Sequence, residues 1–185
     1  MVGAGTGTGK VVVNRCMSLD GFTAGPGDAM DWVFDFMPPV ESAFPEIMAA
    51  TGAMLIGRRT YEVGKRMADG PNPPAYDGGA QFVLTHHVPD PPDPGVTFLT
   101  GDIGAAVGTA LRAAGGKNLE ILGADVAGQC LRRGLVDEIL VYVLPVLLGD
   151  GIRFASPPGP GRIDLEPLGS TRSGAVTILR FRVRK

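Results

Sequence analysis

Residues 53–62 read AMLIGRRTYE, and this stretch decides the class of fold. The first five residues are apolar and end at Gly57, as is typical of a short buried strand. A helix is predicted from Thr60 to about Arg66, so a strand passes into a helix within three residues. Such a junction is the building unit of an α/β fold.

A second stretch, residues 118–133, has the same arrangement. NLEIL at 118–122 predicts a strand, and Asp125 is the expected N-cap of a helix that runs to Arg133, before Gly134. Two strand-to-helix junctions favour a sheet in which most strands run parallel, with helices on both faces.

The remaining elements follow by working outward from these junctions. The first strand, 10–19, is apolar over most of its length, so we expect it in the middle of the sheet. The last two strands form a hairpin around Ser173-Gly174 that adds an antiparallel edge. The other expected elements are a long loop at 20–39, a helix at 41–51 stopped by Gly52, strands at 81–85 and 96–99, a helix at 102–114 capped by Asp102, a strand at 138–148 interrupted by Pro145, and hairpin strands at 162–171 and 175–183.

Composition excludes several classes of protein. The chain has 185 residues, of which 44% are hydrophobic and 19% are charged, so its 28 glycines and 16 prolines indicate turns rather than disorder. A net charge of −2 makes nucleic acid an unexpected partner, and no apolar run reaches the length of a membrane helix. The two cysteines, Cys16 and Cys130, are too few for a disulfide framework or a zinc site. We therefore expect a cytoplasmic protein without a bound metal.

The amino terminus carries a misleading motif. Residues 3–10 read GAGTGTGK, like a phosphate-binding loop, but no strand can precede Gly3 and a strand, not a helix, follows Lys10. We predict a flexible tail at residues 1–9 and one domain over residues 10–185.

Three strand ends present groups that suit phosphate. Gly57 allows close approach of a ligand, and Arg58, Arg59 and Thr60 offer guanidinium and hydroxyl donors beside a helix N-terminus. The second junction offers small residues at the start of a helix, and the third offers a hydroxyl and an imidazole. These two sets are Gly123, Ala124, Asp125 and Val126, and Thr85 with His86.

The long loop at 20–39 carries carboxylates beside an aromatic residue. Asp20 or Asp31 could protonate or orient a flat heterocycle, with Trp32 against it. Asp20 could equally be a turn former, and Trp32 a core residue. Tyr61 is a further candidate substrate contact.

An ordered set of short motifs resembles the dihydrofolate-reductase-like superfamily, and within it the C-terminal reductase domain of the riboflavin-biosynthesis deaminase–reductase. The motifs are SLDGFTA at 18–24, Asp31-Trp32, LIGRRTYE at 55–62, Leu84-Thr85, GADV at 123–126 through Gln129, GLVDE at 134–138 and PVLLGDG at 145–151. One departure is Leu122, which stands where the family usually has a first glycine.

The resemblance implies a three-layer α/β fold and NADPH as cofactor. In such proteins the 57–60 junction contacts the 2′-phosphate and pyrophosphate, Thr85 and His86 lie near the 2′-phosphate, and the 123–126 turn lies under the pyrophosphate. It implies a reductase that transfers a hydride to a small heterocycle, either 5-amino-6-(5-phosphoribosylamino)uracil or a dihydropterin, and a homodimer.

Two other classes stay open. The same cleft could bind a flavin or a nucleotide without turnover. The protein could also be a structural homodimer that has lost its site, for which Leu122 is the only support.

Overall fold

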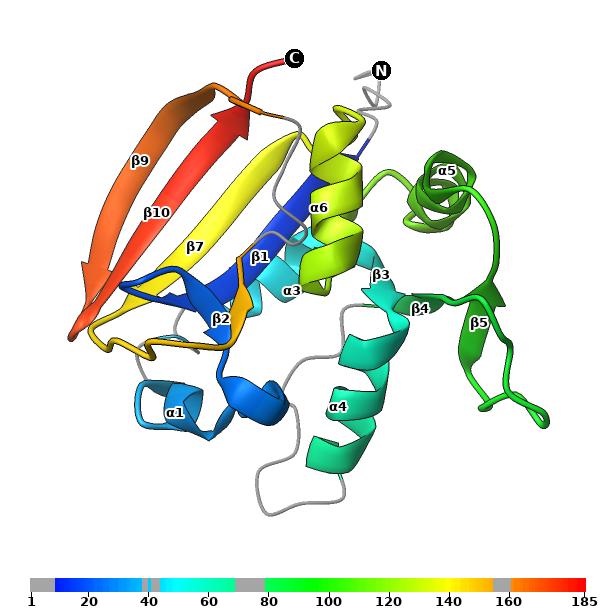
Figure 1. Cartoon of the computed structure of the whole chain (residues 1–185). Helices are drawn as coiled ribbons and strands as arrows, with labels where there is room; N and C mark the ends of the chain where they lie inside the picture. Colours follow the sequence, from blue (N-terminus) through cyan, green and yellow to red (C-terminus); the bar gives the residue numbers. More distant parts are fainter. Residues whose placement is uncertain (1–8, 38–39, 41–43, 69–78, 155–160) are drawn as a thin grey trace.

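Strand β1 (Val11–Ser18) lies inside an eight-stranded sheet, with order β5-β4-β3-β6-β1-β7-β10-β9. The computed structural model describes residues 9–37, 40, 44–68, 79–154 and 161–185. The eight strands are those formed by these residues. Figure 1 shows the sheet with β9 and β10 at one side and β4 and β5 at the other. The other strands are β3 (Thr51–Gly57), β4 (Ala80–Leu84), β5 (Val96–Leu99), β6 (Asn118–Leu122), β7 (Glu138–Leu144), β9 (Leu165–Ser173) and β10 (Val176–Val183).

The sheet is mixed and mostly parallel, as expected. β1 pairs in parallel with β6 and β7, and β3 pairs in parallel with β4 and β6. β10 runs antiparallel to both β7 and β9, which confirms the antiparallel C-terminal edge. The prediction that β1 is central is also confirmed.

Two helices cover one face of the sheet. α5 (Ile103–Ala113) and α6 (Ala124–Arg132) contribute Val107 and Ala127 to a buried cluster with Val13, Leu55 and Ile121 of the central strands. As predicted, the Asp102 side chain caps α5, accepting hydrogen bonds from the next turn. This cluster is the main core.

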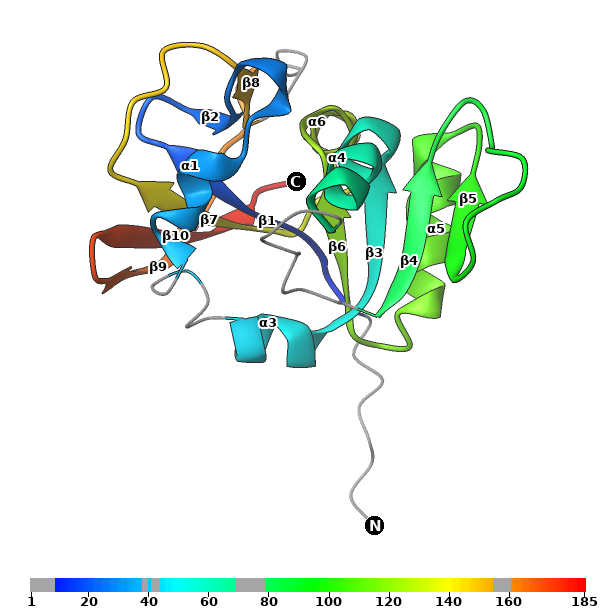
Figure 2. The same cartoon turned by 90° about the horizontal axis from the view of Figure 1, so that it is seen from below.

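The opposite face is covered by α1 (Asp31–Phe34), α3 (Phe44–Ala50) and α4 (Arg58–Ala68). Val33 of α1 and Ile47 of α3 pack in a cluster with Tyr142 of β7, and Tyr61 of α4 packs against Met54 of β3. Figure 2 shows the sheet crossing the molecule between these layers. The three-layer fold is therefore confirmed.

The prediction of a long loop at 20–39 is wrong in part. This segment contains strand β2 (Phe22–Ala24), the short helix η1 (Pro26–Asp28) and α1. β2 pairs with β8 (Ile152–Arg153) in a second, two-stranded sheet. Elements of two to four residues are too short to give a periodic pattern, so sequence alone did not reveal them.

Several predicted boundaries are also wrong. Gly52 does not stop a helix, because α3 ends at Ala50 and Gly52 lies inside β3, where a Cβ would come 2.2 Å from the Ala114 carbonyl oxygen. α4 begins at Arg58 rather than Thr60. Asp125 is not the N-cap of α6; Gly123 holds that position.

The ends of the chain agree with expectation where they are described. β1 follows Lys10 directly, so no helix follows the glycine-rich motif. Residues 1–8 of the predicted tail lie outside the described residues. The C-terminal hairpin forms, although its first strand begins at Leu165 rather than at 162.

Candidate functional site

The two strand-to-helix junctions that decided the fold touch each other. A Cβ on Gly57 would lie 3.0 Å from a methyl carbon of Val126, and a Cβ on Gly123 would lie 2.8 Å from the Thr60 hydroxyl oxygen. Gly123 also has φ +103°, a conformation that side-chain-bearing residues rarely adopt. Only glycines allow the N-termini of α4 and α6 to meet this closely.

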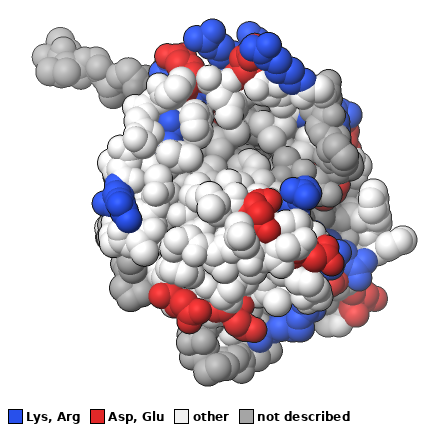
Figure 3. Space-filling view, turned by 60° about the vertical axis from the view of Figure 1, so that its left-hand side comes forward, with Lys and Arg blue, Asp and Glu red and all other residues white. Residues whose placement is uncertain are grey.

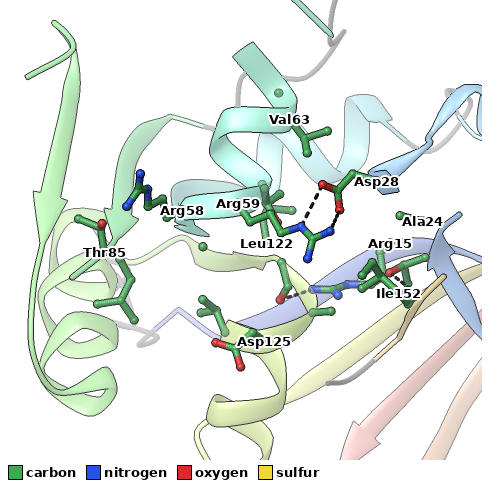
Figure 4. Close-up of a pocket in the computed structure, with 18 of the residues that line it drawn as sticks. Arg15, Ala24, Asp28, Arg58, Arg59, Val63, Thr85, Leu122, Asp125 and Ile152 are labelled. Atoms are coloured by element: carbon green, nitrogen blue, oxygen red, sulfur yellow. Dashed lines mark hydrogen bonds and ion pairs between the residues drawn. The ribbon is translucent and has the colours of Figure 1, made fainter. Parts of the chain in front are cut away.

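A cavity of about 810 Å³ lies against this contact. Figure 4 shows it between α4, the start of α6, the end of β4 and the β2–β8 pair. The structure brings together, around this one cavity, every residue predicted to bind cofactor. They are Gly57, Arg58, Arg59, Thr60, Thr85, His86, Gly123, Ala124, Asp125 and Val126.

The first turn of α6 lines the cavity. Its N-cap, Gly123, has no side chain to cap the helix, and the first amide N–H groups of a helix lack intrahelical acceptors. Together with the helix dipole, these amides favour an anion. Asp125, in the same turn, is exposed and accepts a hydrogen bond of 2.7 Å from the Gln129 side chain. Its charge opposes an anion bound at this turn.

The two arginines of α4 have different partners. Arg58 is exposed and pairs with Glu62 one turn along the helix, at 2.8 Å. Arg59 pairs at 2.7 Å with Asp28 of η1, and this hydrogen-bonded contact raises the pKa of Arg59. Figure 4 shows the Arg59–Asp28 pair joining α4 to the opposite wall of the cavity, with Arg58 directed toward Thr85.

Thr85 stands at the end of β4 and is 6% exposed. Its hydroxyl donates to the His87 carbonyl oxygen at 2.9 Å and accepts from the His87 N–H at 3.2 Å. His86 and His87 are exposed, and both line the cavity. The cavity therefore has a polar end formed by Arg58, Thr85 and the two imidazoles.

Arg15 is a cavity residue that sequence reasoning missed. Its guanidinium donates to the carbonyl oxygens of Phe154 at 3.1 Å and Gly123 at 3.2 Å, and lies over the Phe154 ring. Desolvation lowers the pKa of Arg15 to about 10, although the charge of Glu120 acts in the opposite direction. Arg15 thus remains a cation at neutral pH and braces the Gly123 turn.

Asp20 does not line the cavity. It accepts hydrogen bonds from the Ser18 hydroxyl at 2.6 Å and from the backbone N–H groups of Gly149 at 2.7 Å and Leu148 at 3.1 Å. The Ser18 hydrogen bond, with help from these amides, lowers the pKa of Asp20 to about 2. In the structure the Asp20 side chain joins the end of β1 to the loop after β7.

The other predicted substrate-side residues also lie outside the cavity. Asp31 is the exposed first residue of α1, and Trp32 packs in the cluster around Tyr142. The Tyr61 hydroxyl donates to Asp93 at 2.8 Å, and its ring meets Phe98 edge to face. Burial, followed by the contact with Asp93, raises the pKa of Tyr61 to about 12. The catalytic and substrate roles of these residues stay predictions.

A second cavity of about 190 Å³ lies on the α1 side of the sheet. It shares Arg15 and Cys16 with the first cavity, so the two adjoin across β1. Its lining is Asn14, Arg15, Cys16, Val33, Met37, Val40, Ile47, Glu120 and Tyr142. We call it the recess.

A sequence signal for the recess existed. Asn14 and Glu120 are polar residues inside mainly apolar strands, VVVNRCM and NLEIL. A polar residue at an inward position of a buried strand needs a partner, so it marks a candidate site. Reading each strand by alternate residues would have found them.

Comparison with known proteins gives the family. Residues 9–179 match the family described as the RibD C-terminal domain. The chain belongs to this family. A curated relative is the uncharacterized protein YwjB of Bacillus subtilis (strain 168), 30% identical over 145 residues, which cover 77% of this chain and 80% of YwjB.

Solved structures share the fold of this RibD C-terminal domain protein. A protein from Shewanella sp. PV-4, whose name assigns it to riboflavin biosynthesis, superposes with a TM-score of 0.79 at 22% identity, over 95% of this chain and 99% of that one. RibD of Acinetobacter baumannii gives 0.70 at 17% identity, over 97% of this chain but only 59% of RibD. Dihydrofolate reductase from Enterococcus faecalis, solved with NADP(H), gives 0.65 at 12% identity, over 96% and 98%. At these identities the likeness concerns the fold.

Among the described residues, no three His, Cys, Asp or Glu side chains cluster in a way that could hold a metal ion. Within the same part of the chain, no helix combines the length and apolar character needed to cross a membrane.

Proposed function

We propose that this RibD C-terminal domain protein is an NADPH-dependent reductase that delivers a hydride to a small heterocyclic substrate. The observation that carries the proposal is the meeting of two helix N-termini beside a cavity of about 810 Å³ with a cationic, hydroxyl-bearing end. A cavity of this size is large for a single-ring ligand and suits an extended, dinucleotide-sized one.

The residues of the cavity fit the parts of NADPH. Arg58 and His86 would hold the 2′-phosphate, because a guanidinium and an imidazole donate hydrogen bonds to phosphate oxygens. The Thr85 hydroxyl would join them by turning its proton from the His87 carbonyl oxygen to the phosphate. The uncapped first turn of α6 would hold the pyrophosphate, since its amide N–H groups suit an anion and Gly123 has no side chain to obstruct it.

The far end of the cavity lies at β2 and β8, beside Asp28 and Arg15 (Figure 4). Thr23 and Ala24 of β2 and Ile152 of β8 line it, together with Met30. We infer that these residues hold the nicotinamide ring and keep water from it. The bound cofactor would supply the hydride, and the protein would supply binding and orientation. Arg15 would keep the Gly123 turn in place through its hydrogen bond to the Gly123 carbonyl oxygen.

Arg59 has a separate role in this proposal. Because it is tied to Asp28 across the cavity, it would close the wall over the middle of the cofactor rather than serve the 2′-phosphate. Arg58 and Arg59 would therefore have different roles, although the sequence analysis assigned both of them to phosphate binding.

The test compares NADPH and NADH binding to Arg58→Ala. Loss of one charge-assisted hydrogen-bonding partner costs about 1.5–3 kcal/mol, so NADPH affinity should fall about 10- to 100-fold while NADH affinity changes less than about threefold. Arg112→Ala, which changes an exposed residue of α5 that does not line the cavity, is the matched control. Equal NADPH affinity in all three proteins would overturn the assignment.

Turnover is tested by following NADPH oxidation with a dihydropterin and with 5-amino-6-(5-phosphoribosylamino)uracil. Consumption of either one supports the reductase. Tight binding of FMN, with no binding of NADPH, would instead favour the alternative of a flavin protein without turnover.

We also propose that the protein is a homodimer that pairs through the β9–β10 hairpin. β9 is the last strand of the sheet, is exposed over most of its nine residues, and presents Leu165 and Leu168 to solvent. Figure 3 shows a face on this side of the molecule with few charged side chains at its centre. Long exposed edge strands are favoured sites of pairing. Light scattering should give twice the chain mass, and Leu168→Lys should reduce it; a wild-type monomer contradicts the proposal.

A further inference from the structure

Three polar side chains meet on one face of the central sheet, beneath the layer of α1 and α3. Glu120 of β6 is level with Val12 of β1, and Tyr142 of β7 is level with Cys16, so Asn14 lies between them along β1. All three line the recess. Adjacent parallel strands therefore place an amide, a carboxyl group and a phenol around one small space.

The polar atoms of the recess are deeply buried. Glu120 is 2% exposed and Tyr142 is 1% exposed. The Tyr142 hydroxyl and the Asn14 side-chain oxygen are buried without a hydrogen-bond partner. Burial raises the pKa of Tyr142, which keeps the phenol neutral. Buried polar groups are normally paired, so two unpaired ones beside a space mark the recess as a candidate binding site.

The rest of the recess is apolar. Val33, Met37, Val40 and Ile47 line it on the side away from the sheet. A volume of about 190 Å³ holds one ring, and an apolar wall facing a polar edge suits a flat heterocycle. The shared residues Arg15 and Cys16 put such a ring next to the larger cavity.

We propose that the recess recognises the substrate by a ring edge carrying adjacent N–H donors, as in a 2-amino-pyrimidin-4-one, in preference to a dioxo ring such as uracil. The naming of this ring as the substrate rests on the proposed function. Oxygen acceptors dominate the recess: the Glu120 carboxyl oxygens and the Asn14 side-chain oxygen, with the Tyr142 hydroxyl able to donate or accept. A ring amino group beside a ring N–H matches them, whereas a carbonyl at that position directs lone pairs at acceptors.

The carboxyl group that faces the substrate is then Glu120, on the sheet, rather than Asp20 or Asp31 in the loop. Glu120 feels the charge of Arg15, which joins the recess to the turn at Gly123. A site built around hydrogen bonds to a ring discriminates strongly against an analogue that cannot make them, because its own buried groups are left unpaired.

The test uses isocytosine and uracil, which have the same ring and differ at position 2 in an amino group against an oxygen. Each is titrated into the full chain and followed by NMR, and NADPH affinity is measured separately. Isocytosine should bind about tenfold or more tightly than uracil. Glu120→Gln and Tyr142→Phe should each weaken isocytosine about tenfold and leave NADPH affinity within about threefold. Glu166→Gln, on exposed strand β9, is the matched control.

Thermal unfolding separates binding from structure. Because the Tyr142 hydroxyl is unpaired, Tyr142→Phe should keep or raise the Tm, whereas Tyr61→Phe, which loses a hydrogen bond to Asp93, should lower it. Isocytosine shifts confined to the recess support the proposal. Equal binding of uracil, or unchanged isocytosine binding in both recess variants, overturns it. Failure of NADPH to bind, with isocytosine binding intact, would instead remove the proposed function and leave the recess as a ring-binding site.

Discussion

Gly123→Ala is the sharpest perturbation of the 810 Å³ cavity, because the structure separates its effect on stability from its effect on binding. The new Cβ would lie 2.8 Å from the Thr60 hydroxyl oxygen. The alanine backbone would also have to adopt a φ of about +103°. Gly134→Ala is the matched control: it also has positive φ, +62°, at the other end of α6, but nothing lies within 4 Å of its Cβ.

The expected magnitudes follow from these geometries. A non-glycine residue at positive φ costs about 1–2 kcal/mol, so Gly134→Ala should lower the Tm by roughly 2–8 °C for a chain of this size. Gly123→Ala should cost about 1–3 kcal/mol from its backbone conformation, and somewhat more from the contact with Thr60.

NADPH binding distinguishes the two variants. The Cβ of Gly123→Ala stands at the N-terminus of α6 and separates it from α4, so we expect loss of about one charge-assisted hydrogen bond, or roughly 10- to 100-fold in affinity. Gly134→Ala should bind NADPH as the wild type does. Calorimetric titration and thermal unfolding measure both quantities. If Gly123→Ala is destabilised but binds NADPH with unchanged affinity, the cavity is not the pyrophosphate site.

Three further predictions test single carboxylates. Asp125→Asn removes a negative charge from the first turn of α6, so NADPH affinity should rise by about fivefold at low ionic strength, and titration in added salt should shrink the gain. Asp20 has a folded-state pKa of about 2, below its ordinary value of 3.8. Ionised Asp20 therefore stabilises the folded protein fully at pH values above 3.8, and this stabilisation is lost as the pH falls toward 2. The Tm difference between wild type and Asp20→Asn should therefore be largest near neutral pH and close toward pH 2; a constant difference argues against linkage. Asp31→Asn should leave kcat and NADPH affinity within about threefold, because Asp31 is exposed and lies outside both cavities; a fall in kcat of about 10²–10⁴-fold in steady-state assays would restore the proton-relay role to Asp31.

The sequence by itself determined the class of fold and one wall of the cavity. Apolar runs ending in glycine, each followed by a helix, predicted parallel strands with helices on both faces, and the structure has them. The residues proposed to bind the cofactor were found around one cavity for the same reason. In a parallel sheet, strand ends and helix starts gather at one edge, so residues at those positions, such as Gly57, Thr85 and Gly123, share a site whatever their separation in the chain.

Short elements and capping details were not predictable in this way. β2, β8 and α1 have between two and four residues, which is too few to show a period. Gly52 looked like a helix stop, but the reason for a glycine there is the approach of the Ala114 carbonyl, which lies 62 positions away. Only a folded chain brings such a partner near.

The position of the carboxyl groups proposed to face a substrate depends on the tertiary structure. Asp20 and Asp31 were singled out because they lie in a loop beside an aromatic residue, yet Asp20 anchors the 148–149 backbone and Asp31 faces solvent. The buried carboxyl group belongs to Glu120, in a strand that composition alone marks as core. Local sequence shows which residues are polar, but it does not show that they share one recess. Asn14, Glu120 and Tyr142 come from three different strands. Strand order and register bring them together, and these depend on long-range pairing that no short stretch of the sequence contains.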